Sequence, residues 1–287
     1  MAIVVNTNID SLRVQRNLNS ATTNMSKAVE RLTTGSKVNQ AADDAAGFVI
    51  AKGLEAQQRG SVVPQKNAQT GINLLQTAEG NLYVIQEHLL RIRDLTLQAM
   101  NGGYSYDEIK AMEDEVLERT AEIDRISNGA KFNEFQLFPT GGVDDLVLQI
   151  GPNSDEATNT ISVTGVFTEA TTSVLTGRAG QPILFTNGVD AAVDITEFRQ
   201  ILDDLDTGIK EISTRRGTIG AITNRLESAV EALDIQNENL LAAKSRIVDA
   251  DIGEESSNFT KYQILQQASA SLLVQANQQP SIALSLI

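Results

Sequence analysis

A ladder of apolar residues at seven-residue spacing constrains this chain more than any other feature. It runs without a gap over 212–247, and at about 1.5 Å per residue it spans roughly 50 Å of helix. Because a single helix cannot bury such a stripe by itself, a partner helix must run beside it. The ladder consists of Ile212, Ile219, Leu226, Leu233, Leu240 and Ile247.

Two further segments carry stripes that match this ladder. In the first, Leu75, Leu82 and Leu89 are seven residues apart, and a second apolar residue follows each of them after three. The second, over 109–126, repeats the same rhythm after a break at 101–103. The spacing predicts a mainly α-helical fold in which a helix, a returning helix and the late helix pack together, with the ladder against Leu75, Leu82 and Leu89.

Pro64 lies inside the first of these helices. Proline removes a backbone donor and clashes with the preceding turn, but it is tolerated in the first turn of a helix. We therefore expect a kink or a new helix start near residues 60–64, with Ser61 as the cap.

Both ends of the chain carry shorter heptad stripes with weakly charged polar faces, rich in Asn, Gln, Ser and Thr. A solvated helix normally displays more Lys and Glu, whereas amides can be satisfied by burial against identical neighbours. We predict that both ends become ordered by assembly; two ordinary helices of a bundle are the alternative. The stripe residues are Leu18, Met25, Val29 and Leu32 near the start, and Tyr262, Leu265, Leu272 and Ala276 near the end.

The stretch RLTTGSKVNQAADDAAGFVIA, residues 31–51, separates two helical patterns. Gly35 lacks the spacing of a phosphate loop and is typical of a helix C-cap. Asp43 and Asp44 lack the spacing of an EF-hand, and acids at this place favour the start of a helix. The stretch is therefore interpreted as a joint between two helical pieces.

The middle of the chain, over 132–189, is rich in Gly, Thr, Asp and Asn and contains short β-favouring runs at 146–150, 160–163 and 183–185. Breakers between these runs predict hairpins. Between Glu134 and Asp206 there are twelve acids and two bases. Such a segment should face water and repel nucleic acid and anionic lipid, so we expect neither as a partner.

Several kinds of chemistry have no support in the residues. The chain has no cysteine and a single histidine, His88, so thiol catalysis and multi-histidine zinc sites are excluded. A nucleophile elbow and a dinucleotide-binding motif are missing too. We predict no enzyme, no cofactor and no metal. Since neither a membrane span nor a secretory signal is evident, a cytoplasmic protein is expected unless another export route exists.

The stretch LLRIRDLTLQA, residues 89–99, places Arg91 and Leu95 four apart on a helix face beside the apolar stripe. This arrangement predicts a solvent-exposed surface with a structural ion pair.

Five blocks of the sequence together resemble bacterial flagellin, in the order in which that family has them. They cover roughly the first 135 and the last 90 residues, and as a set they are far more specific than any single motif. The blocks are VNTNIDSLRVQRNLN, RLTTGSKVNQAADDAAGFVIA, QTAEGNLYVIQEHLLRIRDLTLQA, EIDRISNGAKFN and SRIVDADIGEESSNFTKYQILQQASASLLVQANQQP.

The resemblance implies a layered filament subunit for swimming motility. Residues 1–34 with 254–287 would form a terminal coiled-coil inner layer, and 35–59 with 241–253 a connecting spoke. Residues 60–135 with 196–240 would form the helical outer-tube layer, and 136–195 a β-rich segment that faces outward. The outer layer would pack through the residues of the first two stripes, with Leu240 as the last rung.

The resemblance also implies partners and a location. The subunit would leave the cell through the flagellum's own export channel, with a secretion chaperone on its C-terminal segment, and polymerise outside beneath a cap. Cap and hook–filament junction proteins are then expected partners. Arg91, Leu95 and Glu115 match the family's contact with a Toll-like innate immune receptor. Phe48, Val49, Glu134 and Pro64 depart from the family's pattern.

Three alternatives stay open at the level of sequence. A hook–filament junction protein shares the terminal blocks, although QILQQASASLLVQANQ favours the filament subunit. A type III secreted effector or coiled-coil adhesin is a second reading, and an enzyme carried in the middle region is a third.

Overall fold

The chain forms two compact units, which the computed structural model describes over residues 8–101, 103–141, 146–178, 183–185 and 195–284. Met1–Arg59 and Asn237–Ile287 make up the first unit, and Gly60–Gln236 makes up the second. Two long helices, α2 (Ala45–Ala99) and α6 (Ile195–Val248), contribute residues to both. Long helices with two small antiparallel strand pairs confirm the predicted fold class.

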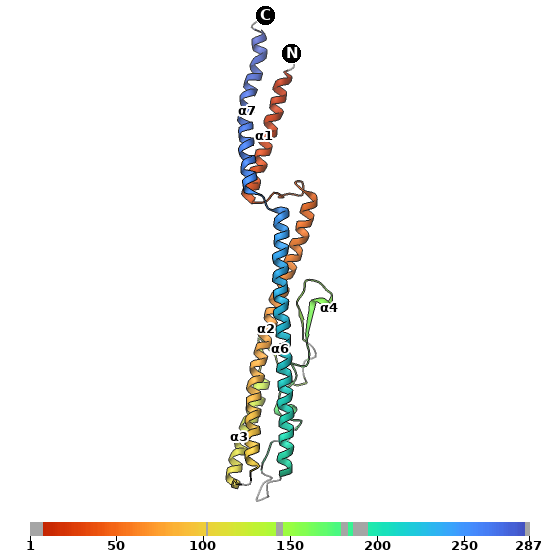
Figure 1. The fold of residues 1–287 in the computed structure, drawn as a ribbon, viewed down its shortest axis with the longest axis vertical. Helices are drawn as coiled ribbons and strands as arrows, with labels where there is room; N and C mark the ends of the chain where they lie inside the picture. Colours follow the sequence, from red (N-terminus) through yellow and green to blue (C-terminus); the bar gives the residue numbers. More distant parts are fainter. Residues whose placement is uncertain (1–7, 102, 142–145, 179–182, 186–194, 285–287) are drawn as a thin grey trace. The chain divides into compact units, whose positions relative to one another are not determined.

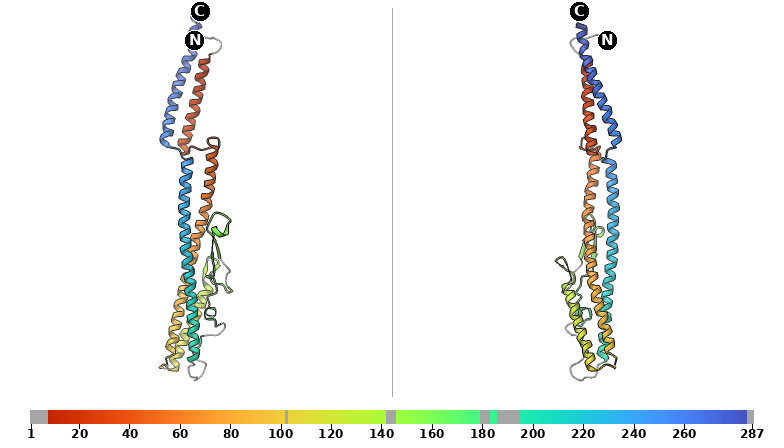
Figure 2. Two further views of the ribbon diagram at one scale, coloured as in Figure 1. Left: turned by 45° about the vertical axis from the view of Figure 1, so that its right-hand side comes forward. Right: turned by 90° about the vertical axis from the view of Figure 1, so that its left-hand side faces the viewer.

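The first unit is built on α1 (Ile9–Thr34) and α7 (Ile252–Leu284), which come from opposite ends of the sequence. Figures 1 and 2 show the two helices side by side, with both chain termini at the same end of the pair. They are therefore antiparallel. The Asn8 side chain caps α1 by accepting a hydrogen bond from the Ser11 backbone N–H at 3.0 Å, and Gly35 ends it in the left-handed conformation at φ +68°.

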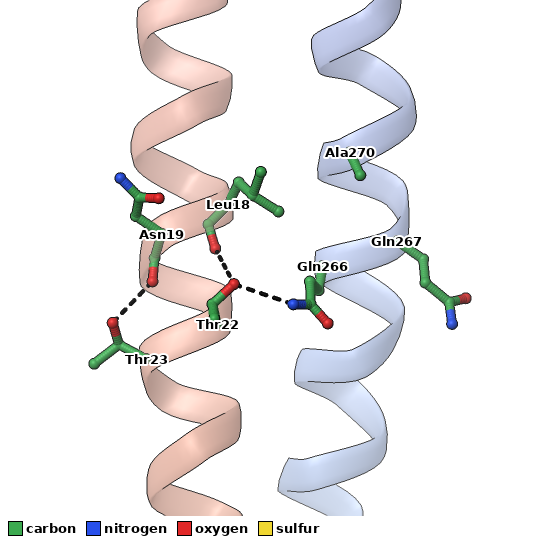
Figure 3. Close-up of a pocket in the computed structure, with 7 residues that line it drawn as sticks. All are labelled: Leu18, Asn19, Thr22, Thr23, Gln266, Gln267 and Ala270. Atoms are coloured by element: carbon green, nitrogen blue, oxygen red, sulfur yellow. Dashed lines mark hydrogen bonds between the residues drawn. The ribbon is translucent and has the colours of Figure 1, made fainter.

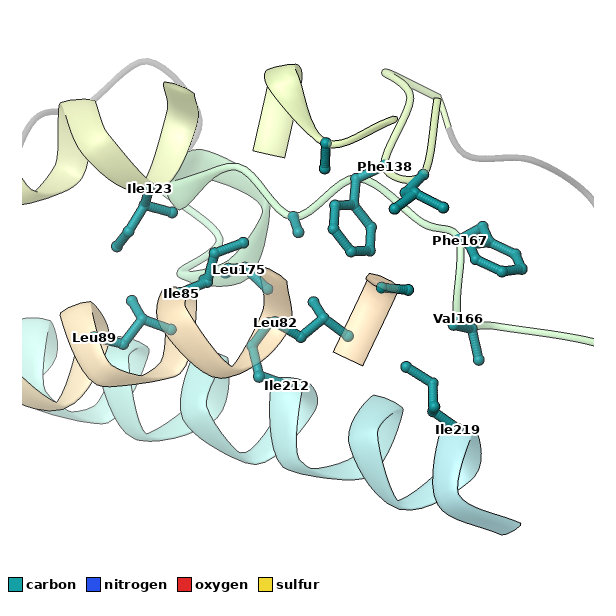
Figure 4. Close-up of a cluster of buried hydrophobic side chains, with 14 of the residues drawn as sticks. Leu82, Ile85, Leu89, Ile123, Phe138, Val166, Phe167, Leu175, Ile212 and Ile219 are labelled. Carbon is teal, nitrogen blue, oxygen red and sulfur yellow. The ribbon is translucent and has the colours of Figure 1, made fainter. Parts of the chain in front are cut away.

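The second unit contains the main hydrophobic core, between α2, α6 and α3 (Tyr106–Gly129). Helix α3 starts at Ser105, whose backbone N–H donates a hydrogen bond to the Glu108 carboxylate at 2.7 Å. Side chains from the three helices and from the middle segment point toward one another in Figure 4. The core includes the two stripes that the sequence predicts to meet: Leu75, Leu82, Leu89, Ile212, Ile219 and Leu226.

The middle segment adds two short hairpins and two single-turn helices to the second unit. Strands β1 (Lys131–Phe132) and β2 (Phe135–Gln136) form the first hairpin, and β3 (Leu146–Gln149) pairs antiparallel with β4 (Thr160–Val163) in the second. The helices are α4 (Glu156–Asn159) and α5 (Thr172–Leu175). Phe138 and Phe167 of this segment are fully buried in the core, as Figure 4 shows.

Charged side chains of the helices hold this middle segment in place by binding its backbone. The guanidinium of Arg215 is buried and donates hydrogen bonds to the carbonyls of Thr168, at 3.0 Å, and Glu169, at 3.2 Å. The Asp124 carboxylate accepts from the Thr172 N–H at 2.7 Å, and Glu113 accepts from the Phe185 N–H at 2.6 Å. A segment with little regular structure thus has several backbone groups satisfied by side chains of the helices.

Two sequence predictions about local structure differ from what is observed. Helix α2 passes through Pro64 as one element, so no new helix starts there, and Ser61 lies fully buried inside the helix instead of capping a start. The alternative of a kink near residues 60–64 stays a prediction. Ser61, Pro64 and Ala68 are all buried, so the proline lies on the packed side of α2, where burial offsets its local cost. The run at 183–185 is not a strand; instead Phe185 stacks on Phe198 with 5.1 Å between ring centroids. Other parts of 136–195 lie outside the described residues.

Candidate assembly interface

Helices α1 and α7 face each other through small side chains. Among the apolar residues that the sequence placed here, Leu18, Met25, Leu32 and Tyr262 are half-buried along this seam, and Ala276 is buried. Small residues bring helices close together but remove little apolar area from water. The other buried positions of the seam are Ala21, Ala28, Glu255 and Ser269.

Polar contacts link the two helices along their length. Arg31 of α1 forms a salt bridge with Glu255 of α7, with 2.8 Å between Nη1 and Oε1. In the middle of the pair, Gln266 Nε2 donates a hydrogen bond to Thr22 Oγ1 at 3.2 Å, as Figure 3 shows. Near the chain ends, Ser11 Oγ donates to Asn277 Oδ1 at 2.7 Å. These contacts, not a leucine core, dominate the seam.

Large apolar side chains of the same pair face away from the seam. Leu265 and Leu272, which the sequence assigns to the inner layer, are 43% and 53% exposed, and Ile264 is 60% exposed. The sequence places Val29 in the stripe of α1, but the structure leaves it 43% exposed and fills the seam with Ala28 instead. The pair therefore exposes large apolar side chains on more than one side. We call them together the outward apolar face, which consists of Ile9, Leu12, Val29, Ile264, Leu265, Leu272 and Val274.

A shallow groove beside the seam is lined by uncharged residues of both helices. Thr22 and Thr23 donate hydrogen bonds to the carbonyls of Leu18 and Asn19, each at 2.9 Å, so their hydroxyl protons are already used. In Figure 3, Gln266 reaches toward α1, whereas Gln267 points away from it. The groove carries no charge and no nucleophile with a neighbouring base, so its residues suit contact with another polar helix better than catalysis.

In the joint predicted at 31–51, the chain that leaves α1 pairs through backbone hydrogen bonds with the chain that connects α6 to α7. The Lys37 N–H donates to the Val248 carbonyl at 2.7 Å, and the Ala250 N–H donates to the Gly35 carbonyl at 2.9 Å. At the start of α2, the Asp44 carboxylate accepts a hydrogen bond from the Gly47 N–H at 2.9 Å. The prediction of a glycine C-cap is therefore confirmed, and that of an acidic helix start is confirmed for Asp44. It is wrong for Asp43, whose carboxylate accepts hydrogen bonds from the N–H groups of Asn39 and Gln40 at 3.3 and 3.1 Å.

The long ladder on α6 is buried over most of its length. Ile212, Ile219, Leu226 and Leu233 are buried, and Leu240 is half-buried. The partner stripe of Leu75, Leu82 and Leu89 is fully buried on α2.

The candidate receptor-contact residues lie where α2 meets α3. Arg91 and Glu115 form a salt bridge with 3.0 Å between Nε and Oε1, and Arg119 also binds Glu115. The hydrogen bond from Arg91 holds the pKa of the Glu115 carboxyl below its usual range, and Arg119 adds to this effect. Leu95, however, is only 2% exposed. The prediction that it lies on the exposed face with Arg91 is wrong, because Leu95 belongs to the hydrophobic core of the second unit.

The formal charge of −14 is carried entirely by the second unit. Residues 1–59 and 237–287 contain ten bases and ten acids, whereas residues 60–236 contain 13 bases and 27 acids. Within the described part of the chain, no cluster of acidic residues and histidines is suited to hold a metal ion. We also find, among those residues, no helix with the length and apolarity that crossing a bilayer demands.

The chain combines a neutral pair of terminal helices that exposes large apolar residues with an acidic helical unit that has its own core. This combination indicates a structural protein that polymerises. Comparisons with known proteins place the chain within this class. The family model described as the bacterial flagellin N-terminal helical region matches residues 5–140, and the model of the C-terminal helical region matches residues 202–287.

Full-length relatives agree with these matches. A flagellin of Bacillus subtilis is 38% identical over 305 residues, covering 99% of both chains. A flagellin of Halalkalibacterium halodurans is 36% identical over 285 residues, covering 99% of this chain and 100% of the relative. The chain belongs to the bacterial flagellin family, and it is a structural subunit of the flagellar filament. Relatives of this family form that filament outside the cell.

A solved structure adds a likeness of fold. A putative flagellar hook-associated protein from Vibrio parahaemolyticus superposes with a TM-score of 0.56 at 18% sequence identity, over 72% of this chain and 100% of that one. At this identity the likeness concerns the fold alone.

Sequence reasoning found Tyr262 and Ala276 of the seam but missed Glu255 and Ser269. The positions of α7 that face α1 are Glu255, Tyr262, Ser269 and Ala276, which are also seven apart. Since one is an acid and another a serine, an apolar criterion passes over them. A search for small residues seven apart would have found Ser269 with Ala276 and Ala21 with Ala28.

Proposed function

We propose that the outward apolar face of the α1–α7 pair binds other copies of this chain and so builds the inner layer of the filament. The observation that carries this proposal is the exposure of Leu265 and Leu272 beside a seam filled by Ala and Ser. A large apolar side chain gains about 1.5–3 kcal/mol when it is fully buried. The exposed leucines and Ile264 thus represent several kcal/mol that the isolated subunit does not gain.

A second copy of the chain is the occupant that the surrounding residues favour. The outward apolar face is flanked by Asn, Gln, Ser and Thr, and the first unit has no net charge. Identical neutral surfaces can approach without electrostatic repulsion, and amides supply both donors and acceptors to the next molecule. Contacts between different faces of successive copies do not close on themselves, so the assembly grows as a helix.

The proposal assigns a place to each part of the chain. Residues 1–34 and 254–287 form the inner layer, and 35–59 with 241–253 form the spoke, which includes the hydrogen-bonded joint. Residues 60–135 and 196–240 form the outer-tube layer with its own leucine and isoleucine core. The segment 136–195, which carries most of the acids of the middle region, faces outward.

Seeded elongation tests the role of the outward apolar face. Leu265→Asp with Leu272→Asp places two charges on this face, so we expect the variant to fold but to stop elongating on preformed filament seeds, as followed by electron microscopy. The matched control is Val147→Asp, which changes an apolar residue that is 51% exposed in the middle segment. The control should elongate normally. Elongation of the double variant at the unchanged rate would refute the proposal.

The remaining partners follow from the same surfaces. An apolar face that is destined for other copies has to be covered before assembly, which suits a secretion chaperone on the C-terminal segment. Filament cap and hook–filament junction proteins would meet the same inner layer at the ends of the polymer. Arg91 and Glu115 form an ion pair that a Toll-like receptor could contact. Leu95 is buried, so it would not touch the receptor and would contribute only by packing in the core of the same unit. Export through the flagellum would deliver the subunit to the outside.

A further inference from the structure

We infer that polar pairs across the α1–α7 seam, and not its apolar packing, select the register in which the two helices lie. The pairs are Arg31 with Glu255, Thr22 with Gln266, and Ser11 with Asn277. The inference rests on the proposed role of the pair in assembly. It names the residues that decide which surface the subunit offers to its neighbours.

The contacts define one alignment along the whole pair. The residue numbers in these three pairs add up to 286, 288 and 288, as expected for two antiparallel helices in constant register. Positions with a sum near 287 therefore lie opposite each other. Leu18 then faces Ser269, and a slide of α7 by one heptad would bring Ala276 or Tyr262 to the same place.

Apolar packing discriminates poorly between these alignments. Apart from Glu255, the buried seam positions are Ala21, Ala28, Ser269 and Ala276, all of which are small. After a slide of seven residues, small side chains again meet small or half-buried ones, so little buried area changes. A coiled coil with uniform seam layers commonly relies on a polar layer to fix its register.

The polar pairs distinguish the alignments sharply. The Glu255 side chain is 9% exposed, and its salt bridge with Arg31 is lost in any slid register. A buried carboxylate without its cation is strongly unfavourable, and an unpaired half-buried amide adds to the cost. A slide by one heptad places Glu255 opposite Asn24 or Val38 and Gln266 opposite Gln15 or Val29, so in either direction Glu255 exchanges its Arg31 cation for a neutral side chain.

Engineered disulfides can report the register, because the chain has no cysteine of its own. A disulfide requires Cα atoms within about 7 Å, whereas a one-heptad slide moves a residue by about 10 Å. Leu18→Cys with Ser269→Cys reports the observed register, and Leu18→Cys with Ala276→Cys reports the slid one. Both are oxidised in seeded filaments of the full chain and in the free subunit. Non-reducing gels separate links within a chain from links between chains.

The test background carries Glu255→Leu and Gln266→Leu, which remove the polar layers and keep helix-forming residues. The control background carries Glu254→Leu and Gln267→Leu, the same changes one residue away, at exposed positions. Gln267 points away from α1 in Figure 3. We expect the observed-register disulfide to exceed the slid one about tenfold or more in the unchanged and control chains, and to lose most of this excess in the test background.

A charge exchange gives an independent readout that needs no apolar substitution. Arg31→Glu alone should increase the slid-register disulfide, and adding Glu255→Arg should lower it again. An unchanged ratio in the leucine background, or no rescue by the exchange, would overturn the inference. If the unchanged chain did not elongate on seeds, the proposed function would fail, and the ratio in the free subunit would still decide the register.

Discussion

The two units of this protein differ in where their large apolar side chains lie. In the second unit, Leu75, Leu82, Leu89, Ile212 and Ile219 meet in a core without access to water. In the first unit, the buried apolar residues among those described are chiefly alanines, while leucines and isoleucines face outward. The second unit has the core of an independent domain. The first has a seam, and its largest apolar residues remain available to other molecules.

The two units also differ in net charge. The second unit carries the whole net charge of −14, and the first is neutral. Like charge keeps molecules apart and favours contact with water, whereas a neutral, amide-rich surface can be buried among copies of itself. The comparison supports the proposal that the ends carry assembly contacts, since the net charge and the main core lie elsewhere in the chain.

The largest expected effect is the loss of stability when a buried leucine of the second unit, and not an exposed leucine of the first, is truncated. Leu82→Ala removes a fully buried side chain from the second unit, so it should lower the free energy of unfolding by about 3 kcal/mol. Leu265→Ala, the same change on the outward apolar face, should cost under about 0.5 kcal/mol in the free subunit. Urea unfolding followed by circular dichroism measures both. Equal losses would show that the two units bury their leucines alike.

A smaller effect concerns the joint of the first unit. Gly35→Ala introduces a side chain at φ +68°, which should cost about 1 kcal/mol, although nothing lies within 4 Å of the added carbon. Hydrogen exchange at the Lys37 and Ala250 amides should become faster. Gly80→Ala in α2 is the control, since it also meets open space but has ordinary helical geometry. It should stabilise its helix slightly; slower exchange at the joint in Gly35→Ala would contradict the account.

The smallest effect is a dependence on pH in the second unit. Because Arg91 and Arg119 lower the pKa of Glu115 in the folded state, its ion pairs stabilise the fold fully above the unfolded value of about 4.3. This contribution is lost as the pH falls through the lower folded-state pKa. Glu115→Gln should therefore lower the free energy of unfolding by about 0.5 kcal/mol at pH 7. It should change it by almost nothing once the pH is below the folded-state pKa of Glu115.

Glu118→Gln is the matched control for this measurement, because it changes an exposed glutamate three residues further along α3. Urea titrations at several pH values compare the two variants. A difference between Glu115→Gln and the unchanged chain that stayed constant across the acid range would rule out the ion pair as its cause.

The sequence predicted what depends on periodicity. The ladder over 212–247, its partner stripe on α2 and the hairpin of 146–149 with 160–163 all follow from spacing and turn residues. The joint also followed, because Gly35 and Asp44 act locally on the ends of their helices.

The failures come from tertiary contacts, which no local pattern contains. Leu95 is buried because it belongs to the core of the second unit, and Pro64 is tolerated inside α2 because it lies on the packed side of that helix. Leu265 and Leu272 repeat at seven residues as a seam would, yet Ser269 and Ala276 occupy the seam. Helix α7 thus carries two rows of residues at seven-residue spacing, and the sequence alone does not say which row packs against α1.

Hydrogen exchange of the free subunit and of seeded filaments tests the central claim most directly. We predict that amides of α7 between residues 260 and 276 exchange much faster in the free subunit than those of α2 around Leu82 and Leu89. In filaments, the α7 amides should become as well protected as the core of the second unit. Protection of α7 in the free subunit equal to that of α2, unchanged on elongation, would contradict the claim that the terminal pair completes its burial only among copies of itself.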